Sequence, residues 1–459
     1  IDPKKYVDDV ANTIKGIWDI MNTSYDRFVR TTDPKHEEIV QKIFKKMYDK
    51  GDIYKGEYKG LYCTPCESFW TESQLDEDGK CPDCHREVHE VSEEAYFFRL
   101  SKYQDQLVKF YEDNPKFIQP ESRKNEMLNN FIKPGLQDLC VSRTSFDWGV
   151  KVPFDPKHVV YVWIDALTNY ITALGYGTDD DSLFKKYWPA DIHMVGKEIV
   201  RFHSIIWPAI LMALDIEMPK KVYGHGWLLF GNDKMSKSKG NIVDPFILCN
   251  NYSVDALRYF MLREVSFGQD GSYTNEAFLK RINGDLCNDL SNLVSRSVAM
   301  VEQYFGGIIP NTNIKEGIDD DLISTLNSMY MEVSDNMEKL YIPEALEAIW
   351  KCIRRLNKYI DETAPWALNK EGNKDRLSTV MYNLCEGIRM VAVILQPFLT
   401  KTPAKIFEKL GIEEGALREF ESLSFGSMKA GNRVSKGDNI FTRLDINKEL
   451  ATMDKILEE

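Results

Sequence analysis

Two lysines and two serines lie close together in Lys234-Met235-Ser236-Lys237-Ser238, which continues as Lys239-Gly240-Asn241. A loop rich in Gly, Asn and Ser is flexible and offers backbone and hydroxyl hydrogen-bond donors, and its ammonium groups can move onto a developing pyrophosphate charge. As composition alone, the segment would be a solvated basic turn. The chemistry that it could perform is the stabilisation of phosphate charge.

Four cysteines form two close pairs, Cys63-Thr-Pro-Cys66 and Cys81-Pro-Asp-Cys84, with fourteen residues between the pairs. This spacing is close to that of four-thiolate zinc knuckles, in which the metal supplies much of the folding energy. Because four thiolates leave no open coordination position, we expect a structural Zn²⁺, about one per chain. The alternatives are disulfides or a redox Cys-x-x-Cys. The odd total of nine cysteines argues against a disulfide scaffold and favours a reducing cytoplasm.

The lysine-rich pentapeptide, with Gly224-His225-Gly226-Trp227 before it and Lys239-Gly240-Asn241 after it, resembles the class I aminoacyl-tRNA synthetases. In that family the loop stabilises the transition state of amino-acid activation. The resemblance implies that Lys237, supported by Lys234, is the principal charge stabiliser, and that Mg²⁺ accompanies ATP. Gly196 and Glu198 stand where the family has a ribose-binding turn, often Gly-x-Asp, and the longer Glu can still accept a ribose hydroxyl. The implied ATP-binding residues are Gly196, Glu198, His225, Lys234, Ser236, Lys237 and Ser238.

Two further segments indicate which amino acid such an enzyme would activate. Trp163-Ile-Asp165-Ala166-Leu-Thr-Asn-Tyr170 and Gly196-Lys-Glu198-Ile199-Val-Arg-Phe-His203 look like the pair that forms the methionine pocket of methionyl-tRNA synthetases. Aromatic walls suit a polarizable thioether, and a His or Tyr proton can hydrogen-bond weakly to sulfur. Without the resemblance, Trp163 and Tyr170 would be ordinary core aromatics on one helix face. The implied pocket residues are Trp163, Ala166, Leu167, Tyr170, Ile199 and His203.

Asn292 and Arg296 lie four residues apart and so share one face of a predicted helix. Amide and guanidinium groups read the edges of unpaired bases, and an aromatic side chain can stack on a base. Trp366, after the helix break at Ala364-Pro365, could be that aromatic, although without a resemblance a packed Trp and a solvated polar face would be the preferred interpretation. Asn-Leu-x-x-Arg and Ala-Pro-Trp match the anticodon-reading elements of methionyl-tRNA synthetases, and this implies that Asn292, Arg296 and Trp366 recognise a CAU anticodon.

The elements that must position these residues change along the chain. Residues 1 to about 50 predict helices, with one start at Thr32-Asp33-Pro34, and residues 52–92 predict short strands and knuckles. The apolar run from Val159 to Ile164 and the later Ile192 to Val195 predict buried strands followed by helices, as in parallel α/β sheets. Three amphipathic patterns then predict an α-helical bundle. These patterns run from Leu286 to Tyr304, from Ile342 to Ile360 and from Leu377 to Leu395.

The resemblance implies an α/β fold, the second half of a Rossmann-like doubly wound parallel sheet with a zinc-knuckle insertion, followed by an all-α anticodon-binding helix bundle. We expect six parts. They are 1–50, the end of the first Rossmann half; 51–150, the connective insertion with the knuckles; 151–230, the second Rossmann half; 231–283, the lysine loop and a connecting α/β segment; 284–425, the anticodon-binding helices; and 426–459, a C-terminal tail.

One family signature is absent, because the sequence contains no His-x-Gly-His segment. In the family this segment binds ATP phosphates and precedes the region that resembles residues 1–30. We therefore expect the active site of this chain alone to be incomplete. Arg143, in Ser142-Arg143-Thr-Ser-Phe-Asp147-Trp148-Gly149, also matches a family segment near the active site, without an assigned role.

A net charge of −13 over 459 residues means that any RNA partner must be held by local basic and aromatic features. No apolar run in the sequence reaches the length of a membrane span, and the start has no secretory signal. The resemblance implies a cytoplasmic methionine-tRNA ligase that uses methionine, ATP and tRNA(Met), initiator and elongator, with neither DNA nor a membrane as partner. The alternatives are another class I synthetase, a catalytically inactive RNA-binding paralogue and a zinc-only interaction module.

Overall fold

A computed structural model describes residues 2–64, 68–70, 75–82, 85–144, 146–231, 233–234, 244–265, 268–312 and 314–458. The chain divides into two compact units. Unit 1 comprises Ile1–Ala11 and Tyr25–His225, and unit 2 comprises Asn12–Ser24 and Gly226–Glu459. Helix α1 (Pro3–Ile20) contributes residues to both units, and α2 (Pro34–Asp49) begins at the predicted Asp33-Pro34. Proline at the first helical position lacks an N–H that would have no partner there, and this favours the observed start.

Unit 1 contains a three-stranded parallel sheet in the order β4 (Ile118–Gln119), β9 (Val222–His225), β8 (His193–Gly196). Strand β8 confirms the prediction made for Ile192 to Val195. Helix α7 (Trp207–Leu214), which is buried at all but one of its residues, lies in the same hydrophobic core as Val195 and Val222. The parallel α/β arrangement that the sequence predicts is therefore present in this unit.

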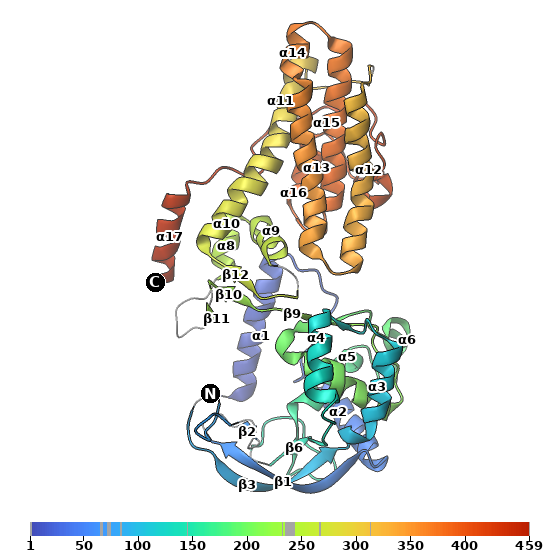
Figure 1. Cartoon of the computed structure of the whole chain (residues 1–459), viewed down its shortest axis with the longest axis vertical. Coiled ribbons are helices and arrows are strands. Elements are labelled where there is room, and N and C mark those ends of the chain that lie inside the picture. Colours follow the sequence, from blue (N-terminus) through green and yellow to red (C-terminus); the bar gives the residue numbers. More distant parts are fainter. Residues whose placement is uncertain are drawn as a thin grey trace. The chain divides into compact units, whose positions relative to one another are not determined.

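A second sheet of unit 1 is antiparallel. Strands β1 (Ile53–Cys63) and β3 (His89–Phe98) form the long curved ribbon of Figure 1, with Ile53 opposite Phe98 and Lys55 opposite Tyr96. Strand β2 (Ser68–Trp70) pairs with β1, and β5 (Leu139–Cys140) pairs with β3. Cys63, the first cysteine of the predicted knuckles, is the last residue of β1.

The prediction of a strand from Val159 to Ile164 is wrong for most of that run. Strand β7 is only Val159–Val160 and pairs antiparallel with β6 (Ser142–Arg143), and helix α5 (Val162–Thr172) follows at once. A short apolar run fits a buried helix as well as a buried strand. Here the helix is favoured because Ile164, Leu167 and Ile171 then lie on one buried face.

The remaining elements of unit 1 are short helices around these sheets. They are η2 (Leu100–Tyr103), α3 (Gln104–Asp113), α4 (Glu121–Met127), η3 (Leu128–Ile132), α6 (Ser182–Tyr187), η4 (Lys197–Ile199) and η5 (Phe202–Ile206).

Unit 2 begins with a small sheet in the order β11 (Asp233–Lys234), β10 (Leu228–Phe230), β12 (Gly271–Tyr273) and is otherwise helical. The three predicted patterns are confirmed as η7 (Ile282–Ser291) with α11 (Asn292–Phe305), α13 (Ile342–Thr363) and α15 (Lys374–Leu395). The shorter helices are α8 (Pro245–Tyr252), α9 (Val254–Glu264), α10 (Asn275–Arg281), α14 (Pro365–Lys370), α16 (Thr402–Lys409), η8 (Ala416–Arg418) and η9 (Phe420–Ser422).

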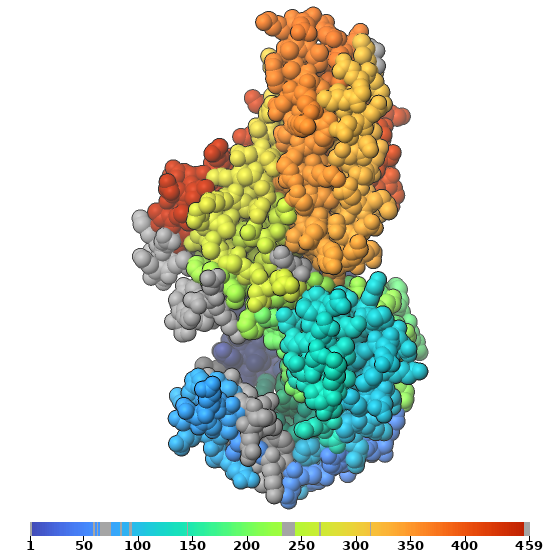
Figure 2. Space-filling model, viewed as in Figure 1, coloured from blue at the N-terminus to red at the C-terminus, as the bar shows by residue number. Residues whose placement is uncertain are grey.

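A further long helix of the bundle, α12 (Gly317–Glu338), was not predicted. It packs along α13 in Figure 1, and the side chains of the two helices meet closely on the face shown in Figure 2. Glu316 and Asp319 form a reciprocal capping box that begins this helix. Helix α17 (Ile446–Glu458) likewise occupies part of the predicted tail.

Helix α15 is the core of the bundle, since every residue from Arg376 to Leu395 is buried. Within the described part of the chain it is the one helix long and apolar enough to cross a membrane, and 94% of its most apolar window is buried in the protein. A buried core helix passes the same test of length and composition as a membrane span. The apolar composition of α15 is therefore explained by its burial in the core of the bundle.

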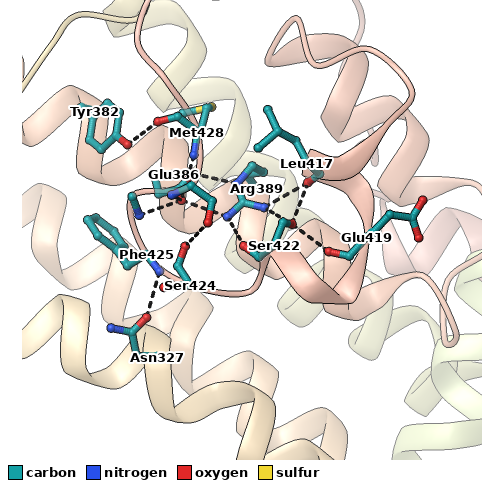
Figure 3. A network of polar contacts seen from close by, with 12 residues as sticks. Asn327, Tyr382, Glu386, Arg389, Leu417, Glu419, Ser422, Ser424, Phe425 and Met428 are labelled. Atoms are coloured by element: carbon teal, nitrogen blue, oxygen red, sulfur yellow. Dashed lines mark hydrogen bonds and ion pairs between the residues drawn. The ribbon is translucent and has the colours of Figure 1, made fainter.

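A buried ion pair fixes the chain that follows α16 onto α15 (Figure 3). The guanidinium of Arg389 lies 2.7 and 2.9 Å from the carboxylate oxygens of Glu386, and neither side chain is exposed. Arg389 also donates to the carbonyl and hydroxyl oxygens of Ser422, while Glu386 accepts the backbone N–H of Gly426 at 2.9 Å. Two charges buried in this way are stable only because they satisfy each other and the neighbouring backbone.

Candidate active site

Tyr170 and His203 are joined by a hydrogen bond within unit 1. The phenol oxygen of Tyr170, on α5, lies 2.8 Å from Nε2 of His203, on η5. Nδ1 of His203 lies 2.9 Å from the carbonyl oxygen of Ile199, which can only accept, so Nδ1 carries the proton and Nε2 accepts from the Tyr170 hydroxyl. Burial lowers the pKa of His203 and raises the pKa of Tyr170 to about 12. Both groups are therefore neutral near pH 7.

The six predicted pocket residues come from two segments, α5 and the turn made by η4 and η5. The ring centroids of Trp163 and His203 are 6.4 Å apart, and Leu167 and His203 are buried. Trp163, Ala166, Tyr170 and Ile199 are half-buried. The structure thus gathers aromatic, aliphatic and neutral polar groups on neighbouring turns, which suits an uncharged ligand.

Sequence reasoning missed the aromatic neighbours of these residues. The ring of Phe202 stacks on that of Trp163 with 3.6 Å between centroids and 9° between planes. Behind Tyr170, the ring of His193 lies 4.2 Å away, and Nε1 of the fully buried Trp207 donates to Nε2 of His193 at 3.2 Å. Burial, reinforced by nearby His203, lowers the pKa of His193 to about 3. The motif Phe202-His203 was visible in the sequence, but the π-helical turn that directs both side chains was not.

Two predicted ATP residues face each other at the ends of parallel strands. Gly196, at the end of β8, is the register partner of His225, at the end of β9. Ligands in open parallel sheets bind beyond the carboxyl ends of the strands, and this is where the two residues lie. A Cβ on Gly196 would come within 2.7 Å of the carboxylate oxygens of Glu198, a contact that this flexible side chain can relieve by moving into solvent. Glu198 is exposed.

The predicted lysine loop is largely beyond what the structure describes. The backbone of Lys234 pairs with Leu229 at the end of a hairpin in unit 2, and Ser236, Lys237 and Ser238 lie outside the described residues. Of the predicted metal ligands, Cys63 and Cys81 are buried, and Cys66 and Cys84 also lie outside the described residues.

The predicted anticodon residues belong to the helical unit. Asn292 is exposed, and Arg296 lies one turn later on α11 with its guanidinium 3.5 Å from the carboxylate of Asp361. Asp361 is near the end of α13, five residues before Trp366 on α14. Trp366 is 49% exposed, so it is not a packed core aromatic. Figure 1 shows α14 at the end of the bundle to which α11 extends.

Arg143 lies on β6 and contacts protein groups in this structure. Its guanidinium lies over the ring of Tyr161, 5.0 Å from the centroid, and donates to Sγ of Cys140 at 2.9 Å and to the carbonyl oxygen of Ser142. Arg143 therefore packs the segment before α5 against β5 and β6.

Known protein families match the chain in two parts. Residues 1–92 and 88–298 match the family described as class I tRNA synthetases (M), and residues 309–455 match the anticodon binding domain of methionyl tRNA ligase. The fold and the site thus define a class I aminoacyl-tRNA synthetase with a helical anticodon-binding domain, as the sequence predicted.

Individual proteins narrow this class further. The methionine–tRNA ligase of Caldanaerobacter subterraneus subsp. tengcongensis is 61% identical over the whole chain, which covers 71% of that protein, and that of Clostridium acetobutylicum is 59% identical with the same coverage. The structure of Mycobacterium tuberculosis methionyl-tRNA synthetase in complex with methionyl-adenylate is 42% identical, with a TM-score of 0.88 over 94% of this chain and 86% of that one. The chain therefore belongs to the methionyl-tRNA synthetase family. Its function is that of a methionine–tRNA ligase, an enzyme that activates methionine with ATP and transfers it to tRNA.

Proposed function

We propose that the methionine side chain binds against Trp163, Ala166, Leu167, Tyr170, Ile199 and His203. The observation that carries this assignment is the hydrogen bond between Tyr170 and His203, which fixes the orientation of two groups that burial keeps neutral. A neutral, mostly apolar surface favours an uncharged thioether over a charged amino-acid side chain, because a charge would lose its hydration without gaining a partner. Aromatic rings such as Trp163 add favourable contacts with sulfur.

The adenosine part of ATP binds in this proposal at Gly196, Glu198 and His225, and the phosphates bind at the lysine loop with Mg²⁺. The bare backbone of Gly196 lets the ribose approach, and the carboxylate of Glu198 accepts a ribose hydroxyl. The loop residues are Lys234, Ser236, Lys237 and Ser238.

The proposed reaction has two steps. A carboxylate oxygen of methionine attacks the α-phosphorus of ATP, the bond to the bridging oxygen breaks, and pyrophosphate leaves with methionyl-adenylate formed. Lys237, with Lys234, stabilises the charge that develops on the pyrophosphate as this bond breaks. In the second step a terminal ribose hydroxyl of the tRNA attacks the methionyl carbonyl and AMP leaves. Positioning and charge neutralisation suffice, because the carboxylate is already a nucleophile.

The CAU anticodon of initiator and elongator tRNA(Met) is proposed to be read by Asn292, Arg296 and Trp366. The proposal includes no DNA partner, and the proposed compartment is the cytoplasm. The reading of the anticodon is supported by the 49% exposure of Trp366, because an exposed aromatic side chain can stack on an unpaired base. The ion pair with Asp361 orients the guanidinium of Arg296 on the same end of the bundle. An exposed pair of this kind contributes little stability, so its orienting effect is the more important one.

Cys63, Cys66, Cys81 and Cys84 are proposed to hold one structural Zn²⁺. Burial of Cys63 and Cys81 supports a metal that is shielded from solvent. Changing Cys63 and Cys81 to Ser should remove about one equivalent of zinc per chain from freshly purified, reduced protein, as metal analysis would measure. A wild-type protein without zinc would exclude the knuckles.

The pocket assignment is tested by the choice of amino acid. Every activity assay uses the chain extended through a His-x-Gly-His segment, because the sequence contains none. Methionine should support ATP–pyrophosphate exchange best, norleucine, which has a methylene in place of sulfur, should do so with a higher KM, and lysine should not support it. Equal exchange with methionine and lysine would exclude a neutral pocket.

A further inference from the structure

A cluster of side chains in unit 1 shares no residue with the sites proposed above. Glu94 lies on β3, and Asp155 and His158 lie on the segment that leads into β7. One ligand atom from each of the three residues lies within 4.8 Å of the others. Nε2 of His158 is 3.5 Å from Oε1 of Glu94 and 3.6 Å from Oδ2 of Asp155.

His158 supplies an independent sign that a ligand belongs here. Its side chain is 1% exposed, and its Nε2 has no hydrogen-bond partner among the described residues although it faces the two carboxylates. Its other nitrogen, Nδ1, lies 3.0 Å from Oγ of Ser142, and that oxygen also accepts the backbone N–H of Tyr96 at 2.8 Å. Metal-binding histidines are oriented in this manner by a hydrogen bond that the N–H of the second ring nitrogen donates. A buried nitrogen without a partner is costly, and a bound cation would remove that cost.

The geometry points to a mononuclear site: we propose that Glu94, Asp155 and His158 bind a divalent transition-metal ion of the Zn²⁺ class. Four ligands at about 2.1 Å around a tetrahedral ion are separated from one another by ~3.4 Å. The two measured separations from Nε2 of His158, 3.5 and 3.6 Å, match this value. An imidazole with two carboxylates selects such an ion over Mg²⁺ or Ca²⁺, which prefer oxygen ligands alone. Because Glu94 is 58% exposed, water can complete the coordination.

The ammonium group of Lys55 forms ion pairs with the same carboxylate oxygens. Its Nζ lies 2.7 Å from Oε1 of Glu94 and 2.9 Å from Oδ2 of Asp155. The Lys55 side chain is 39% exposed, so it can swing into solvent when a divalent ion displaces its ammonium group. The site therefore exchanges one cation for another. With the metal bound, β3 would be tied to the segment that enters α5, five residues before Trp163.

Titration of the full chain with Co²⁺, a spectroscopic substitute for Zn²⁺, tests the site. Thiolate-bound Co²⁺ shows an intense sulfur-to-metal charge-transfer band, whereas the proposed nitrogen and oxygen site adds weaker visible bands without it. The expected result is a second Co²⁺ of the latter kind that is lost in Glu94→Gln and retained in Glu90→Gln, an exposed carboxylate on the same strand. Lys55→Ala should bind this ion roughly tenfold more tightly, because the competing charge is gone.

Three results would overturn the proposal. The wild-type chain could show only the thiolate spectrum, Glu94→Gln could bind Co²⁺ as well as the wild type does, or the second ion could bind only after Lys55 is removed. In the last case the ammonium group is the permanent occupant of the cluster. Circular dichroism of each variant checks that the fold is retained, and the test does not depend on the proposed roles in catalysis.

Discussion

The hydroxyl of Tyr170 donates its hydrogen bond to Nε2 of His203, with 2.8 Å between the two atoms. This bond joins helix α5 to the π-helical turn η5. The hydroxyl proton of Tyr170 is engaged in it, and the ring proton of His203 is engaged by a backbone carbonyl, so neither group has a proton left to donate to a ligand. A methionine sulfur placed here would meet the lone pairs of the phenol oxygen and the faces of the aromatic rings. Selectivity for methionine would then come mainly from shape and polarizability.

Tyr170→Phe should raise the KM for methionine roughly tenfold and leave the KM for ATP nearly unchanged, because a buried acceptor on His203 loses its donor. ATP–pyrophosphate exchange measures both constants. Tyr176→Phe is the matched control, since Tyr176 is also a half-buried tyrosine of unit 1 and packs on Phe184. Equal changes in both KM values would mean that the hydroxyl acts only on the fold.

The low pKa of His193 makes unit 1 sensitive to acid. Its folded pKa of about 3 lies below the ordinary value of about 6.5, so between these pH values the unfolded chain binds a proton that the folded chain does not. Stability is therefore lost as pH falls below about 6.5. From pH 7 to pH 5 the free energy of unfolding should drop by roughly 2 kcal/mol through this residue.

Urea unfolding followed by tryptophan fluorescence measures this loss in the wild type and in His193→Gln. The glutamine variant keeps an acceptor for Nε1 of Trp207 but cannot titrate. It should lack the His193 part of the pH dependence. An identical slope in both proteins would show that His193 is not held neutral by burial.

Trp366→Ala should lower tRNA charging about 10- to 100-fold, the effect of losing one stacked base, and leave adenylate formation unchanged. Charging is followed with labelled methionine, and adenylate formation by pyrophosphate exchange. Tyr330→Ala, another aromatic of the bundle with 43% exposure, should change neither. If the Trp366 variant lost both activities to the same extent, its role would be structural.

Arg389→Met should destabilise unit 2 by roughly 3–5 kcal/mol, because the Glu386 carboxylate is then buried without its partner. The double change Glu386→Gln with Arg389→Met should regain much of this loss, since no charge is left unpaired. Thermal or urea unfolding measured by circular dichroism compares the two. Equal destabilisation of the single and double variants would contradict the view that the charge, rather than packing around Ser422, controls stability.

Much of the architecture could be predicted from local patterns. The Pro34 start of α2, the strand β8 and the amphipathic helices α13 and α15 all follow from capping residues or periodicity that act within one element. Helix α12 carried the same signal, because Leu322, Leu326, Met329 and Val333 are spaced for one buried face. Its acidic cap masked that signal, since a capping box resembles a polar loop in composition.

The rest depended on long-range contacts that no local pattern contains. The run from Val159 to Ile164 changes from strand to helix after two residues, because α5 buries one of its faces in the core of unit 1. The pairing of His158 with Glu94, 64 positions earlier in the sequence, likewise requires the fold. The pocket residues were predictable only by resemblance to a family, and their aromatic supports, His193 and Phe202, were not predicted.

The most direct test of the account is methionine-dependent ATP–pyrophosphate exchange by the chain extended through a His-x-Gly-His segment, with the Lys237→Ala variant as control. We predict exchange that requires methionine and falls steeply in the Lys237 variant, since the developing pyrophosphate charge loses its stabiliser. Absence of methionine-dependent exchange in the extended wild type would contradict the assignment of methionine activation to this chain.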